Sequence, residues 1–327
     1  MKNFLSCDWG STSFRLRLVD AAAWQYSTVK SKDTGIVTIF QLWKQSATGE
    51  QGRFDFYLQV IGRHIRMLES QSGHSLKNLP LVISGMASSS LGMMEMGYKK
   101  IPVFADGRDL EVKKIAGTKD VKNDLYIISG VRTDDDAMRG EETQLAGCES
   151  DLINKRILVF PGTHSKHVTV RKGMVTGIKT FMTGEFFELL GEKSILSSSV
   201  RRSGGLHDKQ NKKSFEAGVL AGRQSNLLHT AFLVRTNRLF NKLTEEENYY
   251  FLNGLIIGAE TGEITEKRNN RVTLVVSGKL KPLYSAAFHA SGFRESENNF
   301  QTEDADLALV KGQWRVLQQY CSDNKFL

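Results

Sequence analysis

A strand, a glycine turn and a second strand follow one another at two places in this chain. Aligned on Gly10 and Gly162, the turns and second strands read G-S-T-S-F-R-L-R-L and G-T-H-S-K-H-V-T-V. In the first copy, apolar side chains alternate with Arg15 and Arg17, which is the period of a strand buried on one face only. Two similar β-hairpins, one at the head of each half, predict a duplicated domain.

Strands and helices alternate through the remaining sequence, which predicts the α/β class. The first half is expected to hold a helix over 54–69, strands over 81–84 and 125–129, and a helix from the N-cap Thr133 to Gly147. The second half is expected to hold helices over 184–196, 214–240 and 245–261, a strand over 272–276 and a helix after Gly278. Because 327 residues suffice for two cores, we place domains at 1–150 and 151–327, with the last helix free to pack back on the first domain.

Composition and charge exclude several classes of protein. Apolar clusters such as residues 255–257 fall far short of the roughly 18 residues that span a membrane, and residues 1–8 meet an acid before any signal-peptide core develops. The three cysteines lack a CxxC spacing, so we expect a reducing cytoplasm and neither a disulfide framework nor a zinc cluster. The net charge is +8, but no aromatic residues interleave the short basic stretches, which predicts no nucleic-acid binding: Lys113-Lys114, Arg201-Arg202, Lys212-Lys213 and Lys267-Arg268.

The first glycine turn carries groups that suit a phosphate. Asp8 ends a strand, and the backbone N–H groups and hydroxyls that follow it can approach a phosphate closely while the acid holds Mg²⁺. The residues of this turn are Gly10, Ser11 and Thr12. A turn in which Asp and Ser bond their own backbone would show the same residues.

The second glycine turn favours phosphate binding, because it offers another glycine, two hydroxyls and a cation. Its residues are Gly162, Thr163, His164, Ser165 and Lys166. No Walker lysine motif occurs, which excludes a P-loop, and the histidine spacings match no transition-metal site.

Acidic residues crowd the helix expected at the end of the first half. The acids of the run 134–142 are candidates for a general base. Acids at a helix start also stabilise the helix dipole and pair with a nearby arginine, so a structural role stays open. Gly140 favours the catalytic interpretation, because glycine in a helix interior costs about 1 kcal/mol relative to alanine and permits close approach of a ligand.

Two further glycines follow strands in the second half. Thr183, Gly184 and Glu185 begin an expected helix, whose N–H groups suit an anion such as a sugar-acid carboxylate, although capping alone would explain them. Gly278 lies between a strand and a helix, where a nucleobase or ribose can lie against exposed backbone.

In their joint order, these motifs resemble those of the sugar kinase, hsp70 and actin superfamily, and more narrowly those of the 2-dehydro-3-deoxygalactonokinase family. The resemblance covers nearly the full chain. It is carried by DWGST from Asp8, MRGEETQL from Met138, PGTHSK from Pro161, MTGE from Met182, the segment Phe251 to Glu260 and the Gly278 turn. It implies two ribonuclease H-like (actin-like ATPase) domains with a cleft between them.

The resemblance also implies an activity, the ATP- and Mg²⁺-dependent phosphorylation of 2-dehydro-3-deoxy-D-galactonate to its 6-phosphate in galactonate catabolism. Asp8 would orient Mg²⁺ and the γ-phosphate, and Arg139 would meet substrate or transition-state charge. Glu142 or Glu141 would act as the base, with Asp136 the weaker candidate. The implied partners are a nucleotide and a small sugar acid in the cytoplasm, without nucleic acid or membrane, and a homodimer is compatible with them.

The ligand contacts follow from the same resemblance. The two glycine turns would bind the phosphates of ATP, through Gly10, Ser11, Thr12, Gly162, Thr163, His164, Ser165 and Lys166. Adenosine would lie at Gly278. The sugar acid would be bound by Ser84, Gly85, Met86, Thr183, Gly184 and Glu185.

The chain departs from the family pattern after Met86. The family usually continues through Gly-Ser and Gly-Trp to Ala-Pro-Tyr, whereas this chain has ASSSLGM over 87–93 and MGY over 96–98. Two alternatives therefore stay open, a kinase for another 2-keto-3-deoxy sugar acid and a non-catalytic nucleotide-binding sensor of the same fold. A nuclease would need further acids at the first hairpin and a basic patch, and the sequence shows neither.

Overall fold

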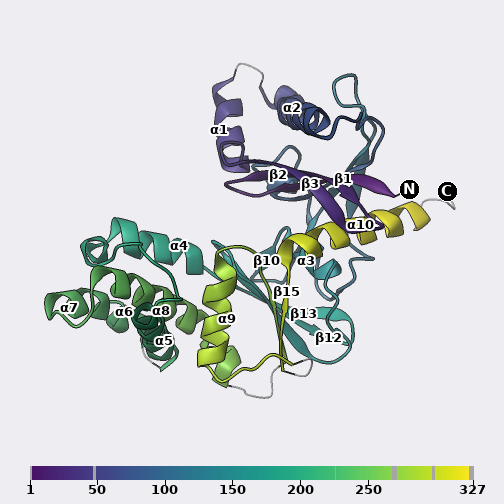
Figure 1. The fold of residues 1–327 in the computed structure, drawn as a ribbon. Helices are drawn as coiled ribbons and strands as arrows, with labels where there is room; N and C mark the ends of the chain where they lie inside the picture. The colour runs from purple at the N-terminus through teal and green to yellow at the C-terminus, as the bar shows by residue number, and fades with distance from the viewer. Residues whose placement is uncertain (1, 47–48, 225, 267–270, 297–298, 324–327) are drawn as a thin grey trace. The chain divides into compact units, whose positions relative to one another are not determined.

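The structure is a computed structural model that describes residues 2–46, 49–224, 226–266, 271–296 and 299–323 (Figure 1). The basic pair Lys267-Arg268 lies outside these residues. None of the helices in the described ranges combines the length and apolar character that crossing a membrane requires. The chain divides into two units, the first made of Met1–Glu149, Arg171–Ile178 and Ala305–Leu327, the second of Ser150–Val170 and Lys179–Asp304.

The first unit is built on a mixed sheet with the strand order β3-β2-β1-β4-β8-β7. Its strands are β1 (Asn3–Trp9), β2 (Phe14–Asp20), β3 (Gln25–Ser31), β4 (Leu81–Gly85), β7 (Val112–Ile115) and β8 (Leu125–Ile128). β1 and β2 form the predicted antiparallel hairpin, and β1 pairs in parallel with β4. The sequence predicts this strand over 3–7, but Asp8 and Trp9 continue its ladder opposite Arg15 and Phe14, so β1 is longer.

Helices cover both faces of this sheet. α1 (Ile36–Gln45) and α2 (Arg53–Ser72) share a buried cluster with Leu5, Cys7, Trp9, Phe14 and Leu16. α10 (Ala305–Asp323), yellow in Figure 1, packs on the other face. There the ring centroids of Trp314 and Phe4 lie 5.3 Å apart. The prediction of a hairpin buried on one face is therefore wrong, because a helix from the far end of the chain covers Arg17, which is 1% exposed.

The helix predicted from Thr133 to Gly147 is wrong in its first half. The chain instead forms the antiparallel strands β9 (Gly130–Arg132) and β10 (Ala137–Met138), and only then α3 (Glu141–Ala146). Thr133 caps the turn between these strands, where its Oγ1 accepts a hydrogen bond from Asp136 N at 2.7 Å. Gly140 lies immediately before α3 with φ +112°, so a left-handed backbone requires this glycine, and it does not lie inside a helix.

Short strands complete the first unit. β5 (Tyr98–Lys100) pairs in parallel with β9, and β6 (Val103–Phe104) pairs with the start of β13 (Met174–Phe181). β5 begins at Tyr98, the last residue of the segment in which the sequence departs from the pattern that it resembles.

The second unit repeats the arrangement of the first hairpin. Its strands are β11 (Arg156–Phe160), β12 (Ser165–Arg171), β14 (Val272–Val275) and β15 (Phe300–Glu303), in the order β15-β14-β11-β12. β11 and β12 form an antiparallel hairpin and β11 pairs in parallel with β14, as β1 and β2 form a hairpin and β1 pairs with β4. The predicted α/β class with two ribonuclease H-like domains is thereby confirmed.

The helices of the second unit are α4 (Thr183–Glu188), α5 (Lys209–Gln224), α6 (Leu227–Thr230), α7 (Leu233–Leu239), α8 (Glu245–Glu266) and α9 (Leu280–Ala290). Two predicted helices are too long. In the helix predicted over 184–196, α4 is followed by a π turn, Leu189–Lys193, and a 3-10 turn, Ile195–Ser199. The helix predicted over 214–240 is divided into α5, α6 and α7. Asn226 caps the start of α6, where its Oδ1 accepts a hydrogen bond from Leu228 N at 2.9 Å.

Glycines set the packing of α8 against α5. A Cβ added at Gly254 would lie 2.0 Å from the carbonyl oxygen of Phe215, and one added at Gly218 would lie 2.2 Å from that of Phe251. The two backbones therefore touch directly, which fixes the position of α8 and of the residues at its C-terminal end.

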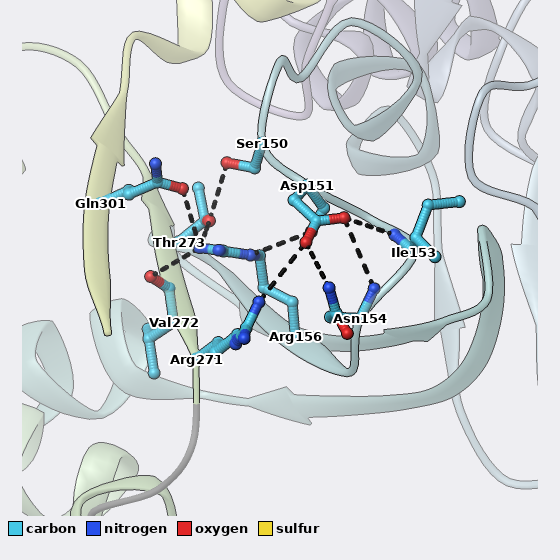
Figure 2. Close-up of polar contacts among 9 residues, drawn as sticks. All are labelled: Ser150, Asp151, Ile153, Asn154, Arg156, Arg271, Val272, Thr273 and Gln301. Carbon is cyan, nitrogen blue, oxygen red and sulfur yellow. Dashed lines mark hydrogen bonds and ion pairs between the residues drawn. The ribbon is translucent and has the colours of Figure 1, made fainter. Parts of the chain in front are cut away.

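A buried arginine joins the strands at one end of the second sheet (Figure 2). Arg156 is 1% exposed, and its Nη1 donates to Thr273 Oγ1 at 3.0 Å and to Gln301 Oε1 at 2.8 Å. Its Nε donates to the carbonyl oxygen of Asp151 at 3.1 Å, and burial lowers the pKa of this guanidinium. Ser150 N donates to Glu303 Oε1 at 2.9 Å. This network ties the entry of the chain into the unit to β14 and β15, which is a structural role.

Candidate active site

Asp8 lies one residue before the end of β1, opposite Arg15 on β2. Arg15 Nη2 lies 2.8 Å from Asp8 Oδ2, and Arg15 Nη1 donates to Asp306 Oδ1 of α10 at 3.0 Å. The buried Arg17 binds the same Asp306 oxygen. The ion pair with Arg15 orients the Asp8 carboxylate. Because the Asp8 side chain is 15% exposed, a ligand can still reach it.

The turn of the first hairpin presents two hydroxyls on a fixed backbone. Ser11 and Thr12 are exposed. The carbonyl oxygen of Gly10 accepts from Ile36 N at 3.0 Å, and a Cβ added at Gly35 would lie 2.4 Å from the backbone of Thr12. The start of α1 therefore holds the turn, which leaves its hydroxyls available to a ligand.

Two glycines bring distant motifs beside Asp8. Gly85 ends β4 with φ +86°, and a Cβ there would lie 2.8 Å from Trp9 O and 3.6 Å from Asp8 Oδ1. Gly140 has φ +112°, and its Cβ would lie 3.3 Å from Gly85 Cα. A side chain at either position would be strained, so only glycines allow the motifs around residues 85 and 140 to converge on the first hairpin.

Ser84 and Met86 flank this contact, and the structure does not present them equally. Ser84 is 1% exposed, and its Oγ accepts from Gln313 Nε2 at 2.9 Å. The same amide nitrogen donates to Cys7 O at 2.9 Å, so α10 is bonded to both central strands. Of the two predicted sugar-acid contacts, Ser84 is turned into the protein and Met86 is half-buried.

Arg139 is bonded to the segment that departs from the family pattern. Its Nη1 donates to the carbonyl oxygen of Ser88 at 2.7 Å and to Ser88 Oγ at 2.6 Å, and its Nη2 donates to Met96 O at 3.1 Å. The guanidinium carbon lies 4.0 Å from the centroid of the Tyr98 ring. The alternative in which Arg139 pairs with an acid of its own helix is wrong, because Arg139 precedes the helix.

Glu142 is a buried carboxylate at the start of α3. Its Oε2 accepts from Gly140 N at 2.7 Å and its Oε1 from Thr143 Oγ1 at 2.9 Å, and the residue is 3% exposed. Burial, helped by the nearby charge of Glu141, raises the pKa of Glu142 from 4.5 to about 7. Glu142 can therefore exchange a proton near neutral pH.

The other two base candidates differ from Glu142 in their surroundings. Glu141 is half-buried, and its Oε2 accepts from Arg139 N at 3.0 Å. Asp136 lies in the turn between β9 and β10, where its Oδ1 accepts from Ala137 N at 2.8 Å. Asp136 thus caps a strand start, and Glu141 adjoins Glu142.

The second hairpin turns some of its predicted phosphate ligands inward. Thr163 and His164 are exposed, and His164 Nε2 lies 2.6 Å from Glu185 Oε2. Lys166 is 7% exposed, and its Nζ donates to the carbonyl oxygen of His164 at 2.8 Å. Ser165 is fully buried. A ligand at the turn would thus meet residues 162–164, with Lys166 bonded to the turn from behind.

The start of α4 packs directly on this turn. Gly184 N donates to the carbonyl oxygen of Thr163 at 3.1 Å, and Glu185 N donates to the same oxygen at 3.2 Å. A Cβ added at Gly184 would lie 2.7 Å from Thr163 Cα and 2.8 Å from Gly162 O. Gly184 therefore has a packing role, and Thr183 beside it is buried.

A cavity of about 60 Å³ adjoins the second hairpin and α9. Its lining includes Gly162, Gly184, Asn253, Leu280, Leu283 and Tyr284. A larger cavity, of about 220 Å³, is lined by Phe181, Met182, Thr183, Phe186, Leu227, Ile256, Ala259 and Glu260. Gly278 is exposed with φ +64°, so the backbone of its turn requires glycine and faces open space.

Several residues at these positions were not predicted as site residues. Asp306 and Gln313 come from α10, and no local pattern connects them with the first hairpin. Ser88 binds Arg139 from a segment without a recognised motif. The sequence does offer a signal for Glu260, because an acid close to the apolar run 255–257 on one helix indicates a buried carboxylate.

Known proteins resemble this chain over nearly its whole length. The profile of the family described as 2-keto-3-deoxy-galactonokinase matches residues 8–316. A relative from Rhizobium meliloti (strain 1021), named a probable 2-dehydro-3-deoxygalactonokinase, is 30% identical over 322 residues, 94% of each chain. The 2-dehydro-3-deoxygalactonokinase of Escherichia coli (strain K12) is 28% identical over 299 residues, which are 88% of this chain and 90% of its own.

A crystal structure from Sinorhizobium meliloti, described provisionally as a 2-dehydro-3-deoxygalactonokinase, is also similar. Its TM-score is 0.77 at 27% identity, with 96% of both chains covered. The motifs at Asp8, Gly140 and Gly162 and the whole-chain matches lead to the same family. The chain therefore belongs to the 2-keto-3-deoxy-galactonokinase family.

Proposed function

We propose that this protein transfers the γ-phosphate of ATP to the terminal hydroxyl of 2-dehydro-3-deoxygalactonate, which gives the 6-phosphate. Membership of the 2-keto-3-deoxy-galactonokinase family over residues 8–316 carries the proposal, and two relatives bear this activity in their names. The convergence of Asp8, Gly85 and Gly140 in the first unit supports it, because phosphoryl transfer depends mainly on positioning and charge.

The first unit would supply the groups that act on the acceptor and the reacting phosphate. During transfer, the acceptor oxygen bonds to the γ-phosphorus, the bond from that phosphorus to the ADP oxygen breaks, and the hydroxyl proton passes to a base. We assign the base role to Glu142, because its pKa of about 7 suits proton exchange at neutral pH. Glu141, one residue earlier, is the alternative base and serves as the comparison variant.

The second unit would bind the nucleotide. The turn of residues 162–164, in which Thr163 and His164 are exposed, offers N–H groups and a hydroxyl to the phosphates. The small cavity between this turn and α9 presents the apolar side chains of Leu280 and Leu283, which suit a nucleobase. Ser165 and Lys166, which the sequence predicts as phosphate ligands, would instead support the turn from inside.

Magnesium fits the first hairpin as an ion held jointly with the substrate. Among the described residues there is no group of three or more His, Cys, Asp or Glu side chains that could hold a metal. Mg²⁺ is usually bound by one or two carboxylates, waters and substrate phosphates, so a single acid at Asp8 is a suitable donor set. When bound, the ion would neutralise phosphate charge, while Arg15 orients the Asp8 carboxylate.

A kinase for a related 2-keto-3-deoxy sugar acid is the second candidate. The observation that favours it is the contact of Arg139 with Ser88 and Met96, both in the segment that departs from the family pattern. A change in residues 87–98 would move Arg139, which lies next to the base candidates Glu141 and Glu142 in the sequence. Substrate choice among epimers would then depend on residues 87–98.

The decisive experiment is an ADP-release assay of the purified protein with ATP, Mg²⁺ and a panel of sugar acids, led by 2-keto-3-deoxygalactonate and its gluconate epimer. Preferred turnover of the galactonate compound is the expected result. Preferred turnover of another acid would establish the second candidate. Binding of ATP by calorimetry without any turnover would instead support a non-catalytic sensor.

The cellular location and the oligomeric state stay predictions. We infer a cytoplasmic protein from the sequence, because its three cysteines are widely separated and lack a CxxC spacing. Light scattering coupled to gel filtration would test whether two copies form a homodimer.

A further inference from the structure

One buried carboxylate in the second unit has four side-chain partners among the residues that the structure describes. Glu260, near the end of α8, has a side chain that is 1% exposed. Its Oε1 accepts from Ser165 Oγ at 2.6 Å and lies 2.9 Å from His167 Nε2. Its Oε2 accepts from Thr183 Oγ1 at 2.6 Å and from Tyr284 OH at 2.5 Å.

These partners come from three separate elements around the proposed nucleotide site. Ser165 and His167 begin β12 directly after the phosphate turn. Thr183 begins α4, whose Gly184 touches that turn, and Tyr284 lies on α9 after the Gly278 turn. Tyr284 and Thr183 also line the cavity of about 60 Å³. A single side chain therefore links every segment that we assign to ATP in this unit.

The chemistry of the cluster favours a charged acid that accepts from all four groups. Burial alone would raise the pKa of Glu260, but the hydrogen bond and charge of His167, with the Ser165 and Thr183 hydroxyls, lower it below its usual value. Burial raises the pKa of Tyr284 well above its usual value, so its hydroxyl stays a donor. A buried charge with this many donors is stable only in one arrangement of its neighbours.

We propose that Glu260 is a positioning residue that holds the phosphate turn, the start of α4 and α9 in the arrangement that receives ATP. The proposal rests on the proposed function, since it assumes that these segments bind the nucleotide. Glu260 does not touch ATP itself, because its oxygens are occupied by the four neighbours. It acts through Ser165, Thr183 and Tyr284 on the segments that carry the site.

The test measures ATP binding and steady-state kinetics for Glu260→Gln and Tyr284→Phe. Glutamine keeps the shape but replaces an acceptor oxygen by a donor, so we expect the Kd and KM for ATP to rise about tenfold. Tyr284→Phe removes one donor and keeps the ring, so we expect a rise of about threefold without loss of folding. The KM for the sugar acid and kcat at saturating ATP should stay within about twofold, because the first unit is unchanged.

Glu263→Gln is the matched control, because Glu263 lies on the same helix with a side chain that is 71% exposed. It should leave the Kd for ATP unchanged. Equal ATP affinity in the wild type, Glu260→Gln and Tyr284→Phe would overturn the positioning role. An equal loss of affinity for ATP and for the sugar acid would overturn it too, since general destabilisation has that effect.

The calorimetric measurement needs no sugar acid, so it separates the two proposals. Suppose that the wild type binds ATP, that Glu260→Gln loses this binding, and that neither protein turns over any sugar acid. This result would contradict the proposed function and support the positioning role. Turnover by a Glu260 variant with wild-type ATP affinity would support the function and contradict the positioning role. A wild-type chain that does not bind ATP would overturn both.

Discussion

In both glycine hairpins a nitrogen-bearing side chain of the second strand contacts an acid, but the acid comes from a different place in each. Counted from Gly10 and Gly162, Arg15 and His167 occupy equivalent positions on the second strands. Arg15 pairs with Asp8 of its own hairpin, whereas His167 pairs with Glu260 from α8. The difference separates an acid placed for chemistry from an acid placed for support, since the Asp8 side chain is 15% exposed and that of Glu260 is 1% exposed.

Breaking the first pair should have the largest effect on catalysis. Asp8→Asn removes the charge that would act on the reacting phosphate and its metal ion. We expect kcat to fall about 100-fold, a loss of about 2–3 kcal/mol of transition-state stabilisation. The rate of ADP release at saturating ATP and Mg²⁺ measures kcat. Asp134→Asn, at a side chain that is 70% exposed, is the control, and a kcat for Asp8→Asn equal to this control would refute the assignment.

Replacing the buried acid of the first unit should lower the rate in a pH-dependent way. Glu142→Gln removes the proposed base, so we expect kcat to fall at least about tenfold with little change in KM. In the wild type, kcat should rise with pH through about 7, because only the deprotonated Glu142 accepts a proton. Glu141→Gln is the comparison, and the same loss in that variant with a retained wild-type profile for Glu142→Gln would exchange the two roles.

The same acid predicts a pH dependence of stability. Because the pKa of Glu142 is raised from 4.5 to about 7, the folded protein binds a proton that the unfolded chain releases. The free energy of unfolding should therefore fall as the pH rises from about 4.5 to about 7, by a few kcal/mol at most. Urea unfolding of the wild type and Glu142→Gln across this range measures it. A wild-type slope identical to that of the variant would show that Glu142 has an ordinary pKa.

The packing of the second hairpin can be tested with one methyl group. Gly184→Ala places a Cβ 2.7 Å from Thr163 Cα, so the phosphate turn must shift. We expect the KM for ATP to rise about three- to tenfold, because such overpacking typically costs about 1–3 kcal/mol. Gly191→Ala is the control, since its Cβ would meet only Leu252 at an ordinary 3.8 Å. An unchanged KM for Gly184→Ala would show that the turn does not contact ATP.

The smallest effect should come from the exposed pair beside the second hairpin. His164 and Glu185 have side chains that are 50% and 39% exposed, so water competes with their interaction. We expect His164→Ala to change the KM for ATP by no more than about twofold, the size usual for exposed ion pairs. A larger loss would mean that the His164 ring itself contacts a phosphate.

Local patterns in the sequence predicted the parts of the fold that depend on neighbouring residues. The strand Phe14–Asp20 follows from alternation, and the glycine turns follow from residue type. The helix expected from Thr133 failed because its acids and threonine close a turn between strands, a competing use of the same residues. Arg17 was expected on an open face, and no local pattern could show that α10 covers it.

The candidate site shows the same limit. The residue types at Asp8 and Glu142 pointed to their chemistry, and the family motifs gave their order. The contact of Gly140 with Gly85 and the partners of Glu260 join residues far apart in the chain, which spacing alone does not predict.

The late position of α10 in the chain determines the order in which the protein can fold during synthesis. Asp306 and Gln313 complete the face of β1 and β2, so the first unit cannot be complete before residues 305–323 have left the ribosome. All residues of the second unit precede them. The unit that begins later in the sequence can therefore fold first, and the nascent first hairpin stays uncovered on its arginine side until the last helix arrives.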